Sequence, residues 1–462
     1  MLVAGVDSST QSTKVVLCDA ADGTILGRGS APHPGGTQCD PAAWWAALQQ
    51  AGDGLLSRAA AVGVAGQQHG MIVLDDAGQV LRPALLWNDL RSAQAAAELL
   101  AEYGGAQWWA SQTGSVPTAS FTVTKLRWLA GHEPANAAAT ARVLLPHDWL
   151  TWRLGAAEPV TDRGDASGTG YFSPATGRWL PELAAAALGH PVALPRVASP
   201  AQVVGETAWG AVLSAGTGDN MGAALGLDLA PGDVAVSIGT SGTVFTVSRQ
   251  PSADPAGSVA GFADATGRFL PLVCTVNAGL VLSSAAAMTG TDLAGLSQLA
   301  LAAQAGAGGI TLLPYLDGER TPDRPAATGV LRGLTTQNAT RENIARAAVE
   351  AVLASLAEAA DLLAVAAALP DDAPRRILLT GGGARSAAVC RLAPGLFLAP
   401  VVVPDPEEYV AVGAARQAAW ALSGRAMPPS WPGRPAAAYD GPPQEGVRAR
   451  YAALREDTVG WS

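Results

Sequence analysis

A strand, a turn of small polar residues and a second strand occur twice in this chain of 462 residues. The first copy covers residues 2–18. The second copy has strands at 233–238 and 243–248 on either side of the turn 239–242. A unit that recurs along a sequence predicts a duplicated architecture. We therefore predict two domains, at residues 1–230 and 231–462, which fits the usual domain length of roughly 100–200 residues.

The other segments favour an α/β fold. Strand-like runs are found at 27–30, 61–65, 71–74 and 376–380, and helix-like runs at 44–60, 221–227, 341–368 and 445–456. The hairpins that begin each half add antiparallel strands, so we predict mixed sheets flanked by helices. Residues 428–444 are rich in Pro and Gly, which predicts an irregular connector.

Charge and composition exclude several classes of protein. The formal net charge is −10, and the chain has only two lysines, Lys14 and Lys125. An acidic chain without a basic cluster binds nucleic acid and anionic membranes poorly. Residues 269–291 and 293–316 carry no charge and are long enough to span a bilayer, but their glycines and polar residues favour buried helices. We predict no membrane span and no nucleic-acid partner.

Cysteine spacing and the first residues of the chain predict a cytoplasmic protein. The four cysteines lie far apart, and no pair has the spacing of a zinc ribbon or a dithiol motif. Sparse cysteines in a long chain are typical of a reducing compartment. The N-terminal residues lack the basic and apolar regions of a signal peptide.

Three turns of small residues, each after a predicted strand, indicate a site for nucleotide phosphates. They are residues 7–14, 237–242 and 381–386. Glycines and hydroxyl residues let backbone N–H groups converge on an anion. One such turn alone is typical of an ordinary tight turn. A lysine-based phosphate loop is excluded because neither lysine follows a glycine.

Two aspartates and one loop are the other candidates. Asp7 ends the first strand, and Asp219 lies in the glycine-rich turn 215–220. Asp219 either caps the following helix or lies beside phosphates, where a carboxylate can accept a proton or organise Mg²⁺. Gln68 and His69 follow a strand, and either pack in the core or bond sugar hydroxyls. Trp87 offers a flat face for a sugar.

These segments together resemble the FGGY carbohydrate kinases, and within them the D-xylulose kinases, over nearly the whole chain. The similar runs are residues 66–70, 86–92, 145–150, 161–169, 215–220, 313–322 and 329–350. Residues 120–132, with Lys125 and Trp128, are similar to a further signature of the family, which we expect to be peripheral to the chemistry.

The resemblance implies two actin-like, ribonuclease-H-like domains with ATP in the cleft between them. It also implies ATP-dependent phosphorylation of D-xylulose to D-xylulose 5-phosphate, and a homodimer. Asp219 would be the general base, and Asp7 and Asp219 would hold Mg²⁺. The implied sugar-binding residues are Gln68, His69, Trp87 and Asn220. The implied ATP-binding residues are Ser8, Ser9, Thr10, Thr13, Gly239, Thr240, Ser241, Gly242, Gly382, Gly383 and Arg385.

One departure from the family pattern keeps other acceptors open. Gln68 stands where the family usually has Met. The alternatives are L-ribulose, another ketose or polyol, glycerol or gluconate. Two further alternatives are an actin-like ATPase that is not a kinase, and a binding protein that has kept the fold and lost catalysis.

Overall fold

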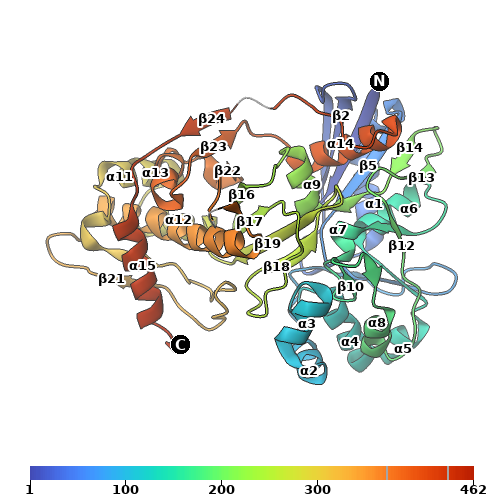
Figure 1. Cartoon of the computed structure of the whole chain (residues 1–462), viewed down its shortest axis with the longest axis horizontal. Coiled ribbons are helices and arrows are strands. Elements are labelled where there is room, and N and C mark those ends of the chain that lie inside the picture. The colour runs from blue at the N-terminus through green and yellow to red at the C-terminus, as the bar shows by residue number, and fades with distance from the viewer. Residues whose placement is uncertain (371–372, 434–435, 462) are drawn as a thin grey trace. The chain divides into compact units, whose positions relative to one another are not determined.

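The computed structural model describes residues 1–370, 373–433 and 436–461, and the chain divides into two compact units (Figure 1). The first unit comprises Met1–Leu229, Arg249–Leu270 and Glu407–Gly433. The second comprises Ala230–Ser248, Pro271–Pro406 and Arg434–Ser462. The first unit thus takes in two later segments that the predicted division at residue 230 assigns to the second half.

The first unit is built on a mixed sheet whose main strand order is β13-β14-β5-β1-β2-β3. Its strands are β1 (Leu2–Ser8), β2 (Ser12–Asp19), β3 (Ile25–Pro32), β4 (Gln38–Cys39), β5 (Ala61–Gly66), β6 (Ile72–Leu74), β7 (Ala84–Leu85), β8 (Arg142–Leu144), β9 (Val160–Asp162), β10 (Phe172–Ser173), β11 (Arg178–Trp179), β12 (Arg196–Ala198), β13 (Val203–Glu206), β14 (Val212–Ser214), β15 (Thr217–Gly218) and β18 (Ala260–Ala263). Its helices are α1 (Pro41–Ala51), α2 (Ala93–Glu102), α3 (Gly105–Thr113), α4 (Thr122–His132), α5 (Pro134–Ala139), α6 (Pro146–Leu154), α7 (Arg163–Ala166), α8 (Pro181–Leu188), α9 (Asp219–Gly226) and α14 (Tyr409–Ser423).

The second unit has a mixed sheet that contains the strand order β19-β17-β16-β22-β23-β24. Its strands are β16 (Asp233–Ile238), β17 (Gly242–Thr246), β19 (Phe269–Thr275), β20 (Thr311–Leu313), β21 (Val330–Arg332), β22 (Arg376–Thr380), β23 (Val401–Pro404) and β24 (Ala436–Tyr439). Its helices are α10 (Gly279–Met288), α11 (Leu293–Ala302), α12 (Arg341–Ala366), α13 (Ala387–Phe397) and α15 (Glu445–Asp457).

The two sheets share one pairing pattern, which confirms the predicted duplication. In the first sheet, β1 is antiparallel to β2 and parallel to β5, and β5 is parallel to β14. In the second, β16 is antiparallel to β17 and parallel to β22, and β22 is parallel to β23. The edge strands β13 and β24 are each antiparallel to their neighbour. This duplicated arrangement of mixed sheets and helices is the predicted actin-like fold.

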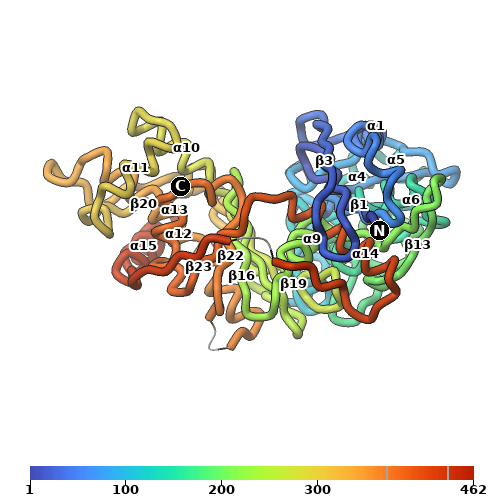
Figure 2. Tube along the Cα trace, turned by 90° about the horizontal axis from the view of Figure 1, so that it is seen from above, coloured from blue at the N-terminus to red at the C-terminus, as the bar shows by residue number. Residues whose placement is uncertain are grey.

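Helix α14, late in the chain, covers part of the first sheet. Its alanines form one buried cluster with Val3, Val16 and Ala61 from β1, β2 and β5. A Cβ on Gly5 of β1 would lie 1.8 Å from the carbonyl oxygen of Ala411, so the helix backbone rests directly on the strand. Figure 2 shows this late segment, in red, beside the blue strand β1.

Three sequence-based expectations need correction or restatement. The helix predicted over 44–60 ends at Ala51, because Gly52 and Gly54 follow and the chain then forms a short 3₁₀ turn at Leu56–Arg58. The predicted connector 428–444 contains strand β24, which pairs with β23. The charge-free segments fold into β19, α10, α11 and β20, and among the described residues no helix has the length and hydropathy needed to cross a membrane.

Candidate active site

Three neighbouring strands of the first sheet end at one edge, and the predicted catalytic residues lie at those ends or directly after them. Strand β5 is parallel to β1, with Asp7 opposite Ala65, and parallel to β15, with Gly218 opposite Gly66. The loop that carries Gln68 and His69 leaves the end of β5, and Asp219 begins α9 directly after β15. The register of the sheet therefore brings Asp7, the Gln68-His69 loop and Asp219 to the same edge.

The two aspartates repel each other in a buried setting. Burial raises the pKa of Asp7 to about 6, although a hydrogen bond from the Ser9 hydroxyl opposes the rise. Burial also raises the pKa of Asp219 to about 7, and the negative charge of Asp7 adds to the effect. The Asn220 backbone N–H donates to Asp219 Oδ1 over 2.8 Å and stabilises the ionised form. Asp219 thus keeps a pKa suited to proton transfer near neutral pH.

The carboxylates of Asp7 and Asp219 are oxygen donors of the kind that bind divalent cations. Two hard oxygen ligands that repel each other are stabilised by a shared positive charge. Within the described ranges, no group of three or more His, Cys, Asp or Glu side chains is placed to hold a metal ion. A cation at Asp7 and Asp219 would therefore take its other ligands from phosphate and water, which is the usual mode for Mg²⁺.

Two of the predicted sugar-binding side chains, Asn220 and Gln68, are linked to Asp219 by hydrogen bonds. Asn220 Nδ2 donates to Asp219 Oδ1 over 3.0 Å and to Gln68 Oε1 over 3.1 Å. The Nε2 atom of Gln68 is buried and has no hydrogen-bond partner in the described part of the chain. An orphaned buried donor costs stability unless a ligand or water satisfies it. The amide of Gln68 is therefore available to an acceptor hydroxyl.

His69 is held on several sides. Its backbone has φ 67°, and its Nδ1 atom lies 2.6 Å from the carbonyl oxygen of Gly168. Because a carbonyl oxygen only accepts, Nδ1 carries the proton. The ring packs against Phe121 and Phe262, with centroids 4.7 and 5.7 Å away. This packing fixes the orientation of the imidazole.

The first predicted phosphate turn divides into two parts. The indole Nε1–H of Trp87 donates to Thr10 Oγ1 over 2.8 Å, so a predicted sugar residue and a predicted phosphate residue meet here. The hydroxyl of Thr13 is fully buried instead, 3.2 Å from Ser8 Oγ and 2.8 Å from His33 Nε2. In this arrangement Thr10 lies towards the surface, whereas Ser8 and Thr13 face the interior.

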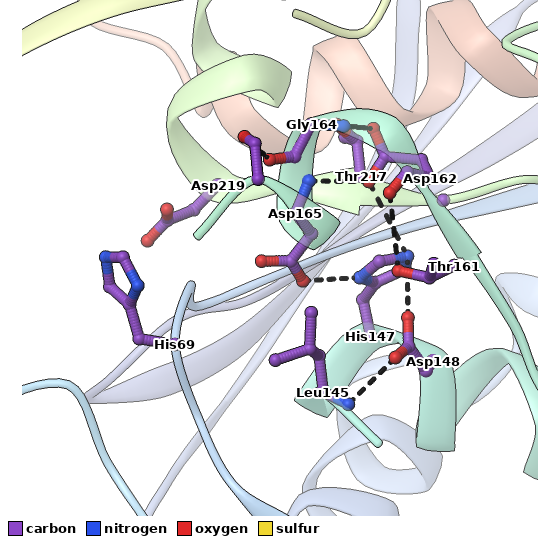
Figure 3. Close-up of polar contacts among 12 residues, drawn as sticks. His69, Leu145, His147, Asp148, Thr161, Asp162, Gly164, Asp165, Thr217 and Asp219 are labelled. Atoms are coloured by element: carbon purple, nitrogen blue, oxygen red, sulfur yellow. Dashed lines mark hydrogen bonds and ion pairs between the residues drawn. The ribbon is translucent and has the colours of Figure 1, made fainter. Parts of the chain in front are cut away.

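A buried cluster of one histidine and three aspartates lies beneath this edge (Figure 3). His147 of α6 lies 2.6 Å from Asp165 and 3.3 Å from Asp148, measured between nitrogen and carboxylate oxygen. Asp162 accepts hydrogen bonds from the backbone N–H groups of Gly164 and Asp165. The hydroxyl of Thr217 also donates to Asp162 over 3.3 Å, which ties the cluster to the strand before Asp219.

The imidazolium of His147 stabilises the carboxylates of this cluster, whereas the carboxylates repel one another. Burial alone would lower the pKa of His147, but Asp148, Asp165 and Asp162 together raise it to about 9. Burial raises the pKa of Asp148 to about 7 and that of Asp162 to about 6, while the imidazolium opposes both rises. The negative charge of Asp165 also contributes to the raised pKa of Asp219.

Glycine is required at position 216, where the turn 215–220 that leads to Asp219 passes the side chain of His147. Gly216 has φ 79°, and a Cβ at this position would lie 2.4 Å from Cδ2 of His147. Both the backbone conformation and the space therefore exclude larger residues. The imidazole thus packs directly against the backbone that leads to Asp219.

The second unit contains a cavity of about 840 Å³ that brings the other two predicted phosphate turns together. Gly239 and Thr240 line it from the turn after β16, and Gly382, Gly383 and Arg385 line it from the turn after β22. Ser241 and Gly242 belong to the same turn but are not among the lining residues. Its apolar wall comes from Leu280, Leu282, Leu293, Leu296 and Val349.

Sequence reasoning missed the apolar wall and the buried cluster. The wall comes largely from α10 and α11, which the sequence marks only as charge-free segments. The cluster residues stand in the runs 145–150 and 161–169, whose polar residues amid apolar neighbours were the available signal. The fully buried side chain of Gln67, whose amide atoms have no partner among the described residues, was also missed.

Comparison with known proteins identifies the family. The model of the FGGY family of carbohydrate kinases, N-terminal domain, matches residues 2–226, and that of the C-terminal domain matches residues 234–422. A xylulose kinase of Streptomyces coelicolor is 47% identical over 439 residues, covering 92% of this chain and 88% of that protein. One from Streptomyces rubiginosus is 46% identical over 443 residues, with coverage of 92% and 88%.

A solved structure agrees with these relatives. The crystal structure of xylulose kinase from Bifidobacterium adolescentis aligns with a TM-score of 0.91 and 42% identity, covering 98% of this chain and 99% of that one. The two family models between them match both repeats of the duplicated fold. This chain therefore belongs to the FGGY family of carbohydrate kinases.

Proposed function

We propose that this protein transfers the γ-phosphoryl group of ATP to the terminal hydroxyl of D-xylulose and releases D-xylulose 5-phosphate and ADP. The observation that carries the proposal is the meeting of Asp219, Asp7 and the Gln68-His69 loop at one sheet edge. The names of the relatives, xylulose kinases at 46–47% identity, support the choice of acceptor.

In the proposed reaction Asp219 is the general base. Its carboxylate accepts the proton of the terminal hydroxyl as the oxygen attacks the γ-phosphorus and the bond to the β-phosphate oxygen breaks. Burial and the charge of Asp7 raise the pKa of Asp219 to about 7 in the metal-free site, which makes its carboxylate a stronger base than an exposed aspartate. Asn220 holds one carboxylate oxygen through two N–H groups, which orients the base.

The acceptor is bound by Gln68, His69 and Asn220, with Trp87 at the exposed margin of the site. Trp87 is 37% exposed, so its ring is accessible to a sugar. The amide of Gln68 donates to one hydroxyl, and the imidazole of His69, fixed by Gly168 and Phe121, contacts another. A sugar hydroxyl both donates and accepts, so this mixed set of groups suits it.

Mg²⁺ would be held by Asp7 and Asp219, where it would offset the negative charge of the phosphates. Ser9 and Thr10 lie beside Asp7 and present hydroxyl groups to the phosphates. The cavity of the second unit binds the adenosine part of ATP: the apolar wall covers the base, and the glycine turns at 239–240 and 382–383 approach the phosphates.

A panel of sugars and polyols tests this function through the release of ADP. The panel contains D-xylulose, L-ribulose, D-ribulose, glycerol and gluconate, each offered with MgATP. We expect the highest kcat/KM for D-xylulose. A clear preference for another member of the panel would overturn the acceptor while keeping the kinase. ATP hydrolysis that is indifferent to every acceptor would favour an actin-like ATPase and overturn both.

Two expectations from the family accompany this proposal. We propose that the protein acts in the cytoplasm, where both ATP and a free ketose are supplied, and that it forms a homodimer. Light scattering after size-exclusion chromatography measures the mass in solution, and a mass near 46.6 kDa would contradict the dimer.

A further inference from the structure

The backbone carbonyl of His69 is the target of two buried side chains from α4. Nζ of Lys125 donates to it over 2.8 Å, and Oγ1 of Thr122 donates over 3.3 Å. His69 has φ 67°, a left-handed conformation that is uncommon for residues other than glycine. Two donors on one carbonyl are a direct means of holding this peptide.

Lys125 is unusual because it is fully buried and its hydrogen bonds go to backbone carbonyls. Its second acceptor is the carbonyl oxygen of Ser120, over 2.6 Å. The neighbouring carboxylate of Asp89 is engaged by Arg91 and Thr37. Burial lowers the pKa of Lys125 to about 7, with Asp89 opposing the shift only in part. A buried lysine without a bonded carboxylate is costly, and a need to hold a particular loop accounts for it.

Lys125 and the ring of His69 belong to one packed assembly. Phe121, which precedes α4, packs against the imidazole at 4.7 Å between centroids. The carbonyl of Ser120, next to Phe121, receives the second hydrogen bond of Lys125. The start of α4 therefore fixes both the backbone and the ring of His69.

We propose that Lys125 and Thr122 are positioning residues of the acceptor site, whose hydrogen bonds to the His69 carbonyl hold this peptide left-handed and so aim the imidazole at the sugar. The inference deepens the proposed function, since it rests on His69 contacting the acceptor. It also gives the family signature at 120–132 a role at the acceptor loop, where the sequence predicted a peripheral one.

The proposal predicts different effects on the KM values of the two substrates. Loss of either donor frees the His69 peptide, which weakens contacts to the acceptor. The ATP cavity described above is lined by residues of the second unit and shares none with α4. The KM of the acceptor should therefore rise while the KM of ATP stays unchanged.

Two threonines on the same helix provide a matched experiment. Thr122 and Thr124 are both fully buried, but the Thr124 hydroxyl lies within hydrogen-bonding distance of Ser92 Oγ and of the carbonyl oxygens of Thr118, Ala119 and Phe121. Its hydrogen bonds thus go to the segment before α4 and to Ser92, whereas that of Thr122 goes to His69. Thr122→Val and Thr124→Val remove the same chemical group. We expect Thr122→Val to raise the acceptor KM about fivefold and Thr124→Val to leave it within about twofold. Lys125→Met should raise it by about tenfold or more.

A second measurement reports on the environment of the His69 imidazole in the absence of substrate. The chain has five histidines, so a spectrum of ¹³C-labelled imidazoles has few signals, and His69→Asn assigns the one from His69. We expect this signal to shift in Lys125→Met and Thr122→Val, and to stay in place in Thr124→Val. If Lys125→Met does not fold, the comparison of Thr122→Val with Thr124→Val still tests whether hydrogen bonds to the His69 carbonyl position the imidazole.

The outcomes separate the two proposals. An acceptor other than D-xylulose in the panel would change the proposed function, and the KM comparison would then be made with that acceptor. Equal KM changes in the two threonine variants, or a His69 signal that stays in place in Thr122→Val, would overturn the positioning role whatever the acceptor is.

Discussion

The Nδ1 atom of His147 lies 2.6 Å from Oδ2 of Asp165, and both side chains are completely inaccessible to solvent. With Asp148 and Asp162 close by, the folded chain keeps a positive imidazolium among carboxylates. Breaking a buried ion pair by removing one partner is strongly destabilising, because the other charge stays buried and uncompensated. This cluster lies under the turn that carries Asp219 and makes stability depend on pH.

His147→Gln should lower stability by about 3–5 kcal/mol at pH 6.5. The pKa of His147 is about 9 in the folded chain and 6.5 in the reference state, so its contribution is full below pH 6.5 and is lost as the pH rises to about 9. The ¹³C signal of the His147 imidazole in the parent protein should titrate with a midpoint near pH 9, and urea unfolding should show the stability of the parent declining from pH 6.5 to 9. Exposed His132, changed to Gln, is the control. An imidazole signal of His147 that titrates at or below pH 6.5, or a variant His147→Gln as stable at pH 6.5 as His132→Gln, would contradict this account.

Asp219→Asn should reduce kcat by at least about 10³-fold, because the amide cannot accept the hydroxyl proton. The affinity for ATP without Mg²⁺, measured by calorimetry in the presence of a chelator, should change little, since the lining of the cavity does not include Asp219. Circular dichroism checks that α9, which Asp219 begins, remains folded. Turnover close to that of the parent protein would exclude Asp219 as the base.

Gln68→Met should change the choice of acceptor. The substitution keeps the length of the side chain but removes the acceptor for Asn220 and the buried Nε2 donor. One lost hydrogen bond to the sugar is expected to raise the KM of the preferred acceptor about fivefold. The ratio of kcat/KM values across the sugar panel should change, with the KM of ATP constant. An unaltered ratio would show that Gln68 does not determine the acceptor specificity.

Gly382→Val should weaken ATP binding by about tenfold or more without unfolding the chain. Gly382 lines the cavity of the second unit, and a Cβ there would meet only the Ile238 carbonyl oxygen, at 4.0 Å. The larger side chain therefore occupies the space next to the turn instead of disturbing the core. Gly441→Val, where the nearest atom would be 3.8 Å away, is the control outside the cavity. Equal ATP affinities in the two variants would argue against this cavity as the nucleotide site.

The fold was largely predictable because its signals are local. The strands 233–238 and 376–380 were predicted with the bounds that the structure gives, and the repeated hairpin predicted the duplication. The predicted helix over 44–60 failed after Ala51, where two glycines outweighed the apolar pattern. Strand β24 was missed because its pairing with β23 is set by tertiary contacts.

The candidate site was predictable only in part. Asp7 lies near the end of its strand and Gln68 and Asp219 follow theirs, and a sequence reader can expect such residues at a sheet edge. The reach of Lys125 to the carbonyl of His69, 56 positions earlier, depends on how α4 packs, which no local pattern encodes. The contact between His147 and Asp165 depends in the same way on how α6 and α7 both pack against β9.

Because helix α14 is late in the chain but packs on the first sheet, the apolar face of that sheet can be covered only late in synthesis. Strands β1 and β5, whose apolar face this helix covers, are synthesised within the first 66 residues. The helix itself is complete only when Ser423 has been added. A nascent chain must therefore carry an exposed apolar face until α14 has left the ribosome. A fragment cut at residue 230 would keep that face bare permanently, so truncation there should yield an aggregating product.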